Sequence, residues 1–233
     1  MSRRGTLIAI EGTNGAGKST QFDLLVAKLK QQRFDVESFR FPQYDQPSSY
    51  FVREYLAGKF GSGKDIGPYT ASMFYVMDRY EASQKIKLAL SKGKIVVTDR
   101  YTGSNMAHQG VYFDNTEQRR GFFIWLDQME FETFQIPRPD ISIVLRVPAE
   151  VAIKNIDQRG IKKDIHEKSL AHTKRSVEVY DNLCQLFPKD FKEIDCTRGG
   201  KLMEKKFIAD QVWKTVSAYL PEHNRVKKKT EQT

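Results

Sequence analysis

Residues 12–20 read G-T-N-G-A-G-K-S-T, and they match the phosphate-loop pattern G-x-x-x-x-G-K-[ST] without a mismatch. The apolar, partly β-branched run Thr6–Ile10 precedes this stretch, and the pattern of an amphipathic helix follows it. A strand, a glycine-rich turn and a helix N-terminus together bind anions, because successive backbone N–H groups point at a phosphate and glycine lets the backbone come close. We expect Lys18 to reach the terminal phosphates of a nucleotide and the Ser19 hydroxyl to hold Mg²⁺. A glycine-rich turn without this role would not account for Lys18 and Ser19 at the start of the helix.

Apolar strand patterns and amphipathic helix patterns alternate along the rest of the chain. The predicted strands are Thr6–Ile10, Val36–Phe41, Lys94–Thr98, Ile141–Val147 and Phe191–Cys196. The predicted helices are Ser19–Gln32, Pro68–Ser91, Thr116–Phe134, Ala149–Gln158, Lys168–Leu186 and Leu202–Leu220. This alternation predicts an α/β fold of the phosphate-loop NTPase type, with a five-stranded parallel sheet covered by helices on both faces. Ligands of such folds bind beyond the carboxyl ends of the strands.

Length and composition limit the classes of protein to consider. The 233 residues suffice for one domain over residues 1–220, and the basic segment 221–233 is expected to be a frayed tail. No apolar run approaches the roughly 20 residues that span a bilayer, so we expect no membrane partner. The two cysteines, Cys184 and Cys196, are few enough to indicate a reducing cytoplasm, and a disulfide between them stays an open alternative.

The formal net charge of +9 has two interpretations. It is compatible with nucleic-acid binding, and equally with a site for polyanionic small molecules on a protein with a solvated basic surface. The sequence shows no interleaving of aromatic and basic residues of the type that binds single strands. We therefore do not expect nucleic acid as a partner.

Asp99 and Arg100 form a second candidate constellation. They follow directly after the predicted strand Lys94–Thr98. A carboxylate at the end of a buried strand, in a chain with a phosphate loop, suits the Mg²⁺ side of a nucleotide site. A neighbouring arginine offers two parallel hydrogen bonds to phosphate. The alternative is a structural ion pair at a strand end, and the phosphate loop favours the functional interpretation.

Taken in order, these motifs resemble the thymidylate kinase family, which phosphorylates dTMP to dTDP. The resemblance extends to Leu220 and includes several short motifs besides the phosphate loop. They are Ile10-Glu11, Phe41-Pro42, Phe74 with Asp78-Arg79, Asp99-Arg100-Tyr101 with Ser104-Asn105, and Pro137-Arg138-Pro139-Asp140.

The resemblance implies ATP and dTMP as the two substrates. On the acceptor side, Phe74 would stack on thymine, Arg79 would contact the base and Arg100 would grip the monophosphate; without the resemblance, Phe74 at helical spacing reads as core. The full implied dTMP set is Asn14, Phe41, Tyr44, Phe74, Arg79, Arg100, Ser104, Asn105 and His108. The implied ATP set is Gly12, Thr13, Asn14, Gly15, Ala16, Gly17, Lys18, Ser19, Thr20 and Arg159.

A short lid is expected at about residues 159–168. One subclass of the family has an arginine inside the phosphate loop where this chain has Gly15, so a lid cation would serve at the transferring phosphoryl group. Arg159, Lys162 and Lys163 are the candidates. Arg159 stacked on adenine and a merely solvated basic loop are the alternatives.

Three positions depart from the family pattern. Asn14 stands where many members have Asp, which shifts metal binding toward Ser19, Asp99 and Glu167. His108 and His166 stand where relatives often have tyrosine, which leaves the strictness of the dTMP preference open.

The expected reaction is in-line transfer of the γ-phosphoryl group from Mg·ATP to dTMP without a covalent intermediate, with Lys18, Asp99, Arg100 and Arg159 as catalytic residues. A deoxynucleoside kinase and a non-catalytic ATP-binding module, the latter supported only by Asn14, are the alternatives. The resemblance also implies a homodimer. The aromatic segments 122–126 and 131–134 could form its interface or could belong to the core.

Overall fold

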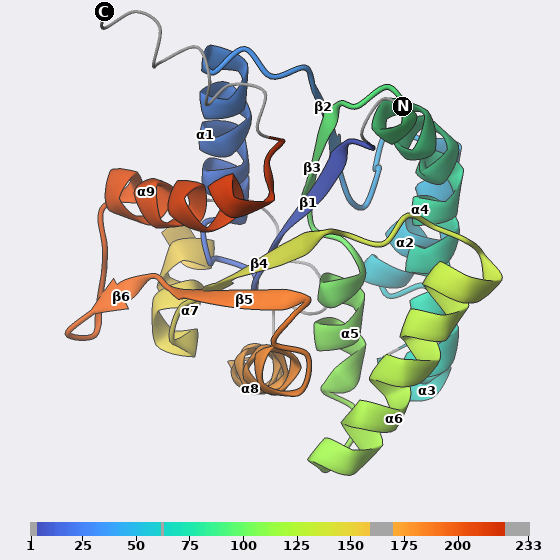
Figure 1. Cartoon of the computed structure of the whole chain (residues 1–233). Helices are drawn as coiled ribbons and strands as arrows, with labels where there is room; N and C mark the ends of the chain where they lie inside the picture. The colour runs from blue at the N-terminus through green and yellow to red at the C-terminus, as the bar shows by residue number, and fades with distance from the viewer. Residues whose placement is uncertain (1–3, 62, 159–169, 222–233) are drawn as a thin grey trace, which may run out of the picture.

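Five parallel strands form the central sheet in the order β2-β3-β1-β4-β5 (Figure 1). The strands are β1 (Thr6–Glu11), β2 (Val36–Arg40), β3 (Ile95–Asp99), β4 (Ile141–Arg146) and β5 (Phe191–Asp195). The coordinates are a computed structural model that describes residues 4–61, 63–158 and 170–221. The predicted fold class is confirmed, and each predicted strand overlaps an observed one with bounds that differ by a single residue.

The register of the sheet brings the ends of β1, β2 and β3 to one edge. Ile10 of β1 and Arg40 of β2 both lie beside Asp99 at the end of β3. Because all five strands are parallel, their carboxyl ends meet at this edge, where Glu11 ends β1. The phosphate loop, Asp99 and Arg100 are therefore brought together by the sheet alone.

Helices cover both faces of the sheet, as predicted (Figure 1). They are α1 (Lys18–Gln31), α2 (Tyr50–Leu56), α3 (Gly63–Ile66), α4 (Pro68–Ser91), α5 (Thr102–Gly110), α6 (Thr116–Asp127), α7 (Ala149–Gln158), α8 (Leu170–Leu186) and α9 (Lys205–Val216). Side chains of α1 and α9 pack on one face of the sheet, and side chains of α4, α5, α6 and α8 pack on the other. With both faces covered, the three central strands β1, β3 and β4 are mostly apolar and buried, whereas the edge strands β2 and β5 carry charged residues.

Two predicted helices are corrected by the structure. The helix predicted over Thr116–Phe134 keeps its α form only to Asp127 and continues as a π-helical segment over Gln128–Thr133. The helix predicted over Leu202–Leu220 begins at Lys205 and ends at Val216, with a 3-10 turn over Ser217–Tyr219. Its first residue, Leu202, instead ends a small hairpin of β6 (Thr197–Arg198) and β7 (Lys201–Leu202), whose turn contains two glycines with positive φ. Lys168, the predicted start of another helix, lies outside the described residues.

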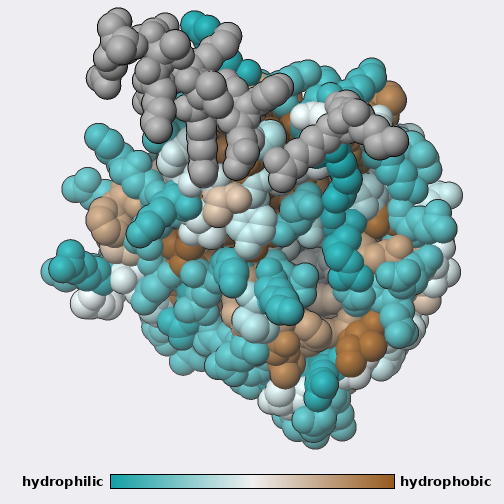
Figure 2. Space-filling model, in the orientation of Figure 1, coloured by the Kyte–Doolittle hydropathy of each residue, from teal (hydrophilic) through white to brown (hydrophobic). Residues whose placement is uncertain are grey.

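Hydrophilic side chains cover most of the face seen in Figure 2, with hydrophobic residues in smaller patches. Within the described ranges, no helix is long and apolar enough to cross a membrane. Cys184 and Cys196 are both free thiols, so the alternative of a disulfide between them is wrong. Burial raises the pKa of the Cys196 thiol to about 12.

Candidate active site

A cavity of about 670 Å³ opens at the carboxyl edge of the sheet. Its walls come from the phosphate loop, the ends of β2 and β3, helices α4 and α5, and the start of α9. This volume lies in the range of small-molecule sites. The fold therefore places a cavity where the sequence motifs predicted one.

The phosphate loop is shaped by glycines that adopt conformations other residues avoid. Gly15 and Gly17 have φ values of 80° and 85°, and a Cβ on Gly15 would lie 2.1 Å from the Ala152 carbonyl oxygen. The loop is tied to α7 by the Asn155 side chain, whose Nδ2 donates to the Gly15 carbonyl over 2.8 Å. An arginine at position 15 would clash with the backbone of α7, so this position of the loop cannot supply the extra cation.

Lys18 is buried and donates from Nζ to the Thr13 carbonyl oxygen over 2.7 Å. Of the predicted ATP-binding residues, positions 14–20 line the cavity. Gly12 and Thr13 do not: Gly12 faces the Leu145 carbonyl and Thr13 is buried. The amino end of α1 and Lys18 thus direct positive charge at the same wall of the cavity.

Ser19 and Asp99 form an oxygen pair on the floor of the site. The Ser19 Oγ donates to Asp99 Oδ2 over 2.8 Å. Arg40 donates from Nη1 to the same oxygen over 3.2 Å, and from Nη2 to Asp23. Sequence reasoning missed Arg40, although its place at the end of a strand, just before Phe41, was a usable signal. A hydroxyl and a carboxylate are ligands that Mg²⁺ prefers, so this pair fits the metal that the sequence implied.

Arg100 lines the cavity and is held by Asn14, Ser104 and His108. It has a φ of 67°, in the left-handed region. Its Nη1 lies 3.1 Å from Ser104 Oγ and 3.4 Å from His108 Nε2, and its Nη2 donates to the Asn14 Oδ1. Burial lowers the pKa of Arg100, but Tyr180, Asp99 and Glu11 more than offset it, so the net shift is upward and the side chain stays cationic.

Glu11 supports this arrangement from beneath and was not predicted as a site residue. It is fully buried and accepts hydrogen bonds from Ser104 Oγ (2.5 Å), the Tyr101 N–H (2.9 Å) and the Tyr180 hydroxyl (3.3 Å). Burial raises the pKa of the Glu11 carboxyl, while the Ser104 hydroxyl and the Arg100 charge lower it, and the net shift is upward. Ser104 therefore links a buried carboxyl to Arg100.

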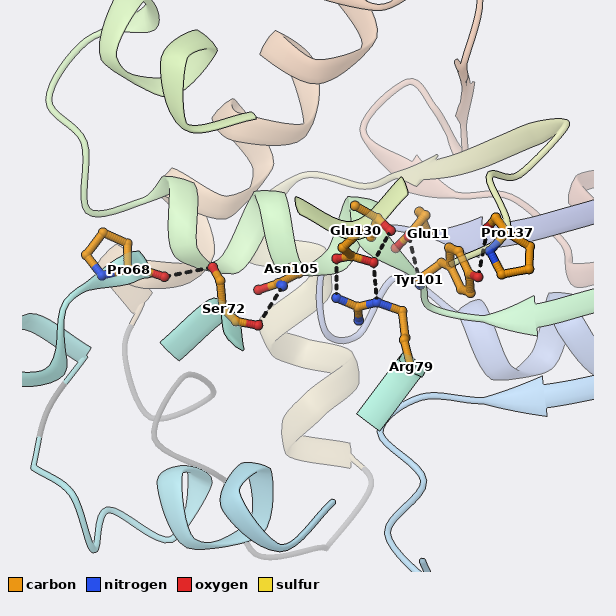
Figure 3. Close-up of polar contacts among 9 residues, drawn as sticks. Glu11, Pro68, Ser72, Arg79, Tyr101, Asn105, Glu130 and Pro137 are labelled. Carbon is orange, nitrogen blue, oxygen red and sulfur yellow. Dashed lines mark hydrogen bonds and ion pairs between the residues drawn. The ribbon is translucent and has the colours of Figure 1, made fainter. Parts of the chain in front are cut away.

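Two polar side chains that line the cavity, Arg79 and Asn105, are held in place by hydrogen bonds (Figure 3). Arg79 is buried and donates to Glu130 twice, from Nε over 2.7 Å and from Nη2 over 2.5 Å. The Asn105 Nδ2 donates to the Ser72 carbonyl over 3.1 Å, which fixes the orientation of the amide. Its Oδ1 is buried and has no hydrogen-bond partner in the part of the chain that the structure describes. Arg79 and Asn105 both line the cavity, as do Phe41, Tyr44, Ser104 and His108.

Phe74 is the one predicted dTMP-binding residue that does not line the cavity. Its ring packs against Phe51, Phe60 and Tyr55, with centroids 5.5–6.0 Å apart. The aromatic residue of α4 that lines the cavity is its neighbour, Tyr75. Consecutive helix residues point about 100° apart, so the two rings cannot face the same space. The predicted lid residues Arg159, Lys162, Lys163, His166 and Glu167 lie outside the described residues.

One cavity is lined by the phosphate loop in one part and by Arg79 and Arg100 in another. Phosphoryl transfer between two nucleotides requires a donor site and an acceptor site side by side, as this arrangement provides. The molecule is thus a phosphate-loop nucleotide kinase. A family model described as thymidylate kinase matches residues 10–207. The chain therefore belongs to the thymidylate kinase family, whose reaction is the phosphorylation of dTMP to dTDP.

Individual relatives agree with this assignment. The chain is 32% identical over 210 residues to the probable thymidylate kinase of Pyrococcus abyssi, covering 88% of this chain and 95% of that protein. It is 29% identical over 222 residues to the thymidylate kinase of Thermomicrobium roseum, covering 94% and 97%. Among solved structures, the thymidylate kinase of Candida albicans has the same fold, with a TM-score of 0.71 and 23% identity over 93% of this chain and 92% of that one.

Proposed function

We propose that this cavity transfers the γ-phosphoryl group of Mg·ATP to the 5′-phosphate of dTMP. The observation that carries the proposal is the continuity of the cavity, which runs from the phosphate loop past Arg100 to Arg79 and Asn105. A donor and an acceptor bound along it would meet between Lys18 and Arg100. An oxygen of the dTMP phosphate then forms a bond to the γ-phosphorus as the bond to the β-phosphate oxygen breaks, and no residue is covalently modified.

On the donor side, the backbone N–H groups of the loop and the Lys18 ammonium bind the ATP phosphates. Ser19 and Asp99 would hold Mg²⁺, which when bound neutralises charge on the phosphates. Arg40 keeps the Asp99 carboxylate in place through the 3.2 Å contact to Oδ2. Asn14 has no charge for Mg²⁺, so Ser19 and Asp99 would carry this role among the described residues; Glu167, the other candidate, lies outside them.

On the acceptor side, Arg100 binds the monophosphate. Among the residues that the structure describes, its guanidinium hydrogen-bonds to Ser104, His108 and Asn14 and forms no ion pair, so it can bind an anionic ligand. Positioning and charge neutralisation of this kind account for most of the catalysis in phosphoryl transfer.

Asn105 and Arg79 explain a preference for thymine. The Asn105 Oδ1 is an acceptor without a partner in the described chain, and the imide N3–H of thymine is a matching donor. Arg79 offers donors to the 4-carbonyl oxygen. Cytosine presents the reverse pattern, with an acceptor at N3 and a donor at its 4-amino group, and would leave both protein groups unsatisfied.

The test is ADP release with Mg·ATP and dTMP, dUMP, dCMP, dGMP, AMP or thymidine as acceptor. We expect dTMP to be preferred, and Lys18→Ala and Arg100→Ala to abolish transfer while an exposed control, Arg120→Ala, retains it. Transfer to thymidine but not to dTMP would establish a deoxynucleoside kinase instead. ATP binding without ADP release beside any acceptor would establish a non-catalytic module.

We also propose a homodimer built on α4 and α6. Phe122, Phe123 and Leu126 belong to the core, but Ile124 is 42% exposed. On α4, four exposed apolar residues fall within roughly 100° of the helix circumference. They are Tyr69, Met77, Tyr80 and Leu88. Tyr69 of α4 packs on Trp125 of α6 (4.7 Å between ring centroids), and we propose that the four α4 side chains and Ile124, together called the α4–α6 patch, form the interface. The cytoplasmic location expected from the sequence stays a prediction.

A further inference from the structure

Glu130 is a buried carboxylate for which phosphoryl transfer has no direct use. It is fully buried in the π-helical segment that follows α6. Its Oε1 accepts from Arg79 Nη2 (2.5 Å), and its Oε2 accepts from Arg79 Nε and the Thr102 hydroxyl (both 2.7 Å). Both oxygens are thus committed to protein donors, as Figure 3 shows for the contacts with Arg79. A buried carboxylate is stable only while its hydrogen-bond donors are all in place. Replacing Glu130 would therefore leave Arg79 and Thr102 without their acceptor.

The fold makes a special arrangement to place this carboxylate. Beyond Asp127 the backbone hydrogen bonds span five residues instead of four. The Phe134 N–H donates to the carbonyl of Met129, five residues back, over 3.0 Å. The Ile136 N–H closes the segment on the Glu130 carbonyl over 2.9 Å. Single π turns of this kind occur often at functional sites. The segment places Glu130 against Arg79, although Glu130 itself is not among the residues that line the cavity.

The ion pair with Glu130 fixes the edge of the Arg79 guanidinium that carries Nε and Nη2. The third nitrogen, Nη1, lies outside this pair. Nε and Nη2 are occupied, whereas Nη1 has no hydrogen-bond partner within residues 4–61, 63–158 and 170–221. The guanidinium also lies 5.9 Å from the centroid of the Tyr101 ring, whose hydroxyl donates to the Pro137 carbonyl over 2.9 Å. Since Arg79 lines the cavity, the occupied edge faces the protein and Nη1 is the donor left for a ligand.

Burial lowers the pKa of Arg79, and the Glu130 carboxylate more than compensates, so the net shift is upward. Arg79 is therefore a cation of fixed orientation. An arginine that could rotate would move away from a donor on the ligand, whereas a fixed one cannot. Fixation of Arg79 thus favours ligands with an acceptor at the facing position and disfavours ligands with a donor there.

We propose that Glu130 is a positioning residue that sets the choice of pyrimidine: by holding Arg79 in place, it favours 4-oxo over 4-amino pyrimidine monophosphates. The inference rests on the proposed function, because it assigns the acceptor base to the Arg79 end of the cavity. It adds a residue that touches no substrate and lies 51 positions from Arg79 in the sequence.

The test compares kcat/KM for dTMP and dCMP in the wild type and in Glu130→Gln. The ratio of the two values in one preparation does not depend on the fraction of folded protein. We expect the preference for dTMP over dCMP to fall on the order of tenfold, because the neutral amide holds Arg79 by fewer and weaker hydrogen bonds. The KM for dTMP should rise while its kcat and the KM for ATP stay within about twofold.

Asp127→Asn is the matched control, since it weakens the neighbouring and more exposed ion pair with Arg138 and leaves Arg79 untouched. If Glu130→Gln does not fold, Glu130→Asp keeps the charge with a shorter reach, and it should lower the same ratio. An unchanged ratio in the folded variant, with both acceptors losing activity together, would reduce Glu130 to a structural role. A wild-type enzyme with no preference for dTMP over dCMP would instead refute the assignment of the base pocket under the proposed function, and this proposal with it.

Discussion

Replacing Tyr75 by leucine removes the aromatic ring that α4 places in the wall of the cavity. A ring in this position has a flat apolar face on which a pyrimidine can stack. Stacking of a base on an aromatic side chain contributes about 1–3 kcal/mol. Since 1.4 kcal/mol corresponds to a factor of ten, kcat/KM for dTMP should fall about 5-fold to about 150-fold. The loss should reside mainly in KM, because stacking is present in the bound substrate as well as in the transition state.

The neighbouring residue provides the control. Phe74 packs among Phe51, Phe60 and Tyr55, away from the cavity lining. Phe74→Leu keeps most of the volume of this cluster, so we expect it to cost up to about 1.5 kcal/mol of stability. Its kcat/KM for dTMP should stay within about twofold of the wild type.

The assay is ADP release at saturating ATP over a range of dTMP concentrations, with urea unfolding of the same preparations. Tyr75→Phe should retain the wild-type KM because it keeps the ring. The reasoning is refuted if Phe74→Leu raises the KM for dTMP while Tyr75→Leu leaves it unchanged. In that case the stacking residue would be the one that the sequence motif indicated.

Two further predictions concern Asn14 and the α4–α6 patch. Asn14→Ala removes the acceptor of Arg100 Nη2, a hydrogen bond to a charged group worth about 1.5–3 kcal/mol. We expect kcat/KM for dTMP to fall about tenfold or more, and a rise confined to the KM for ATP would contradict the assignment of Arg100 to the acceptor. In sedimentation at micromolar concentration, the wild type should have twice the mass of one chain, and Leu88→Glu or Ile124→Glu should yield monomers. Leu24→Glu, which changes a similarly exposed leucine on α1, should leave the dimer intact, and dissociation by this variant alone would locate the interface elsewhere.

The sequence predicts the fold well where the physical signal is local. The central strands β1, β3 and β4 are mostly apolar because both faces of the sheet are covered, and the phosphate loop marks the first strand–helix junction. Helix α5 was not predicted, since Thr102–Gly110 consists mainly of small and polar residues and has only Met106 and Ala107 as apolar ones. The change from α to π geometry after Asp127 could not be predicted either, because the hydrophobic periodicity does not show which backbone carbonyl an N–H group bonds to.

The candidate site divides in a similar way. Contiguous motifs such as 12–20 and 99–100 could be predicted, because the chemistry lies in adjacent residues. Contacts between distant segments could not, and the supporting groups Glu11, Tyr180 and Glu130 all belong to this second kind. Phe74 and Tyr75 show the limit most clearly, since two aromatic residues in sequence differ only in the direction in which the helix points them.

The left-handed backbone of Arg100 has a consequence for how this enzyme changes under selection. A non-glycine residue at a φ of 67° is strained by about 1–3 kcal/mol, and glycine or asparagine would relieve much of this strain. Variants sorted only for resistance to heat would therefore gain by losing the arginine that meets the acceptor phosphate. Directed evolution of this chain for robustness needs catalytic selection in every round, because at this position the most durable molecule and the working one are different sequences.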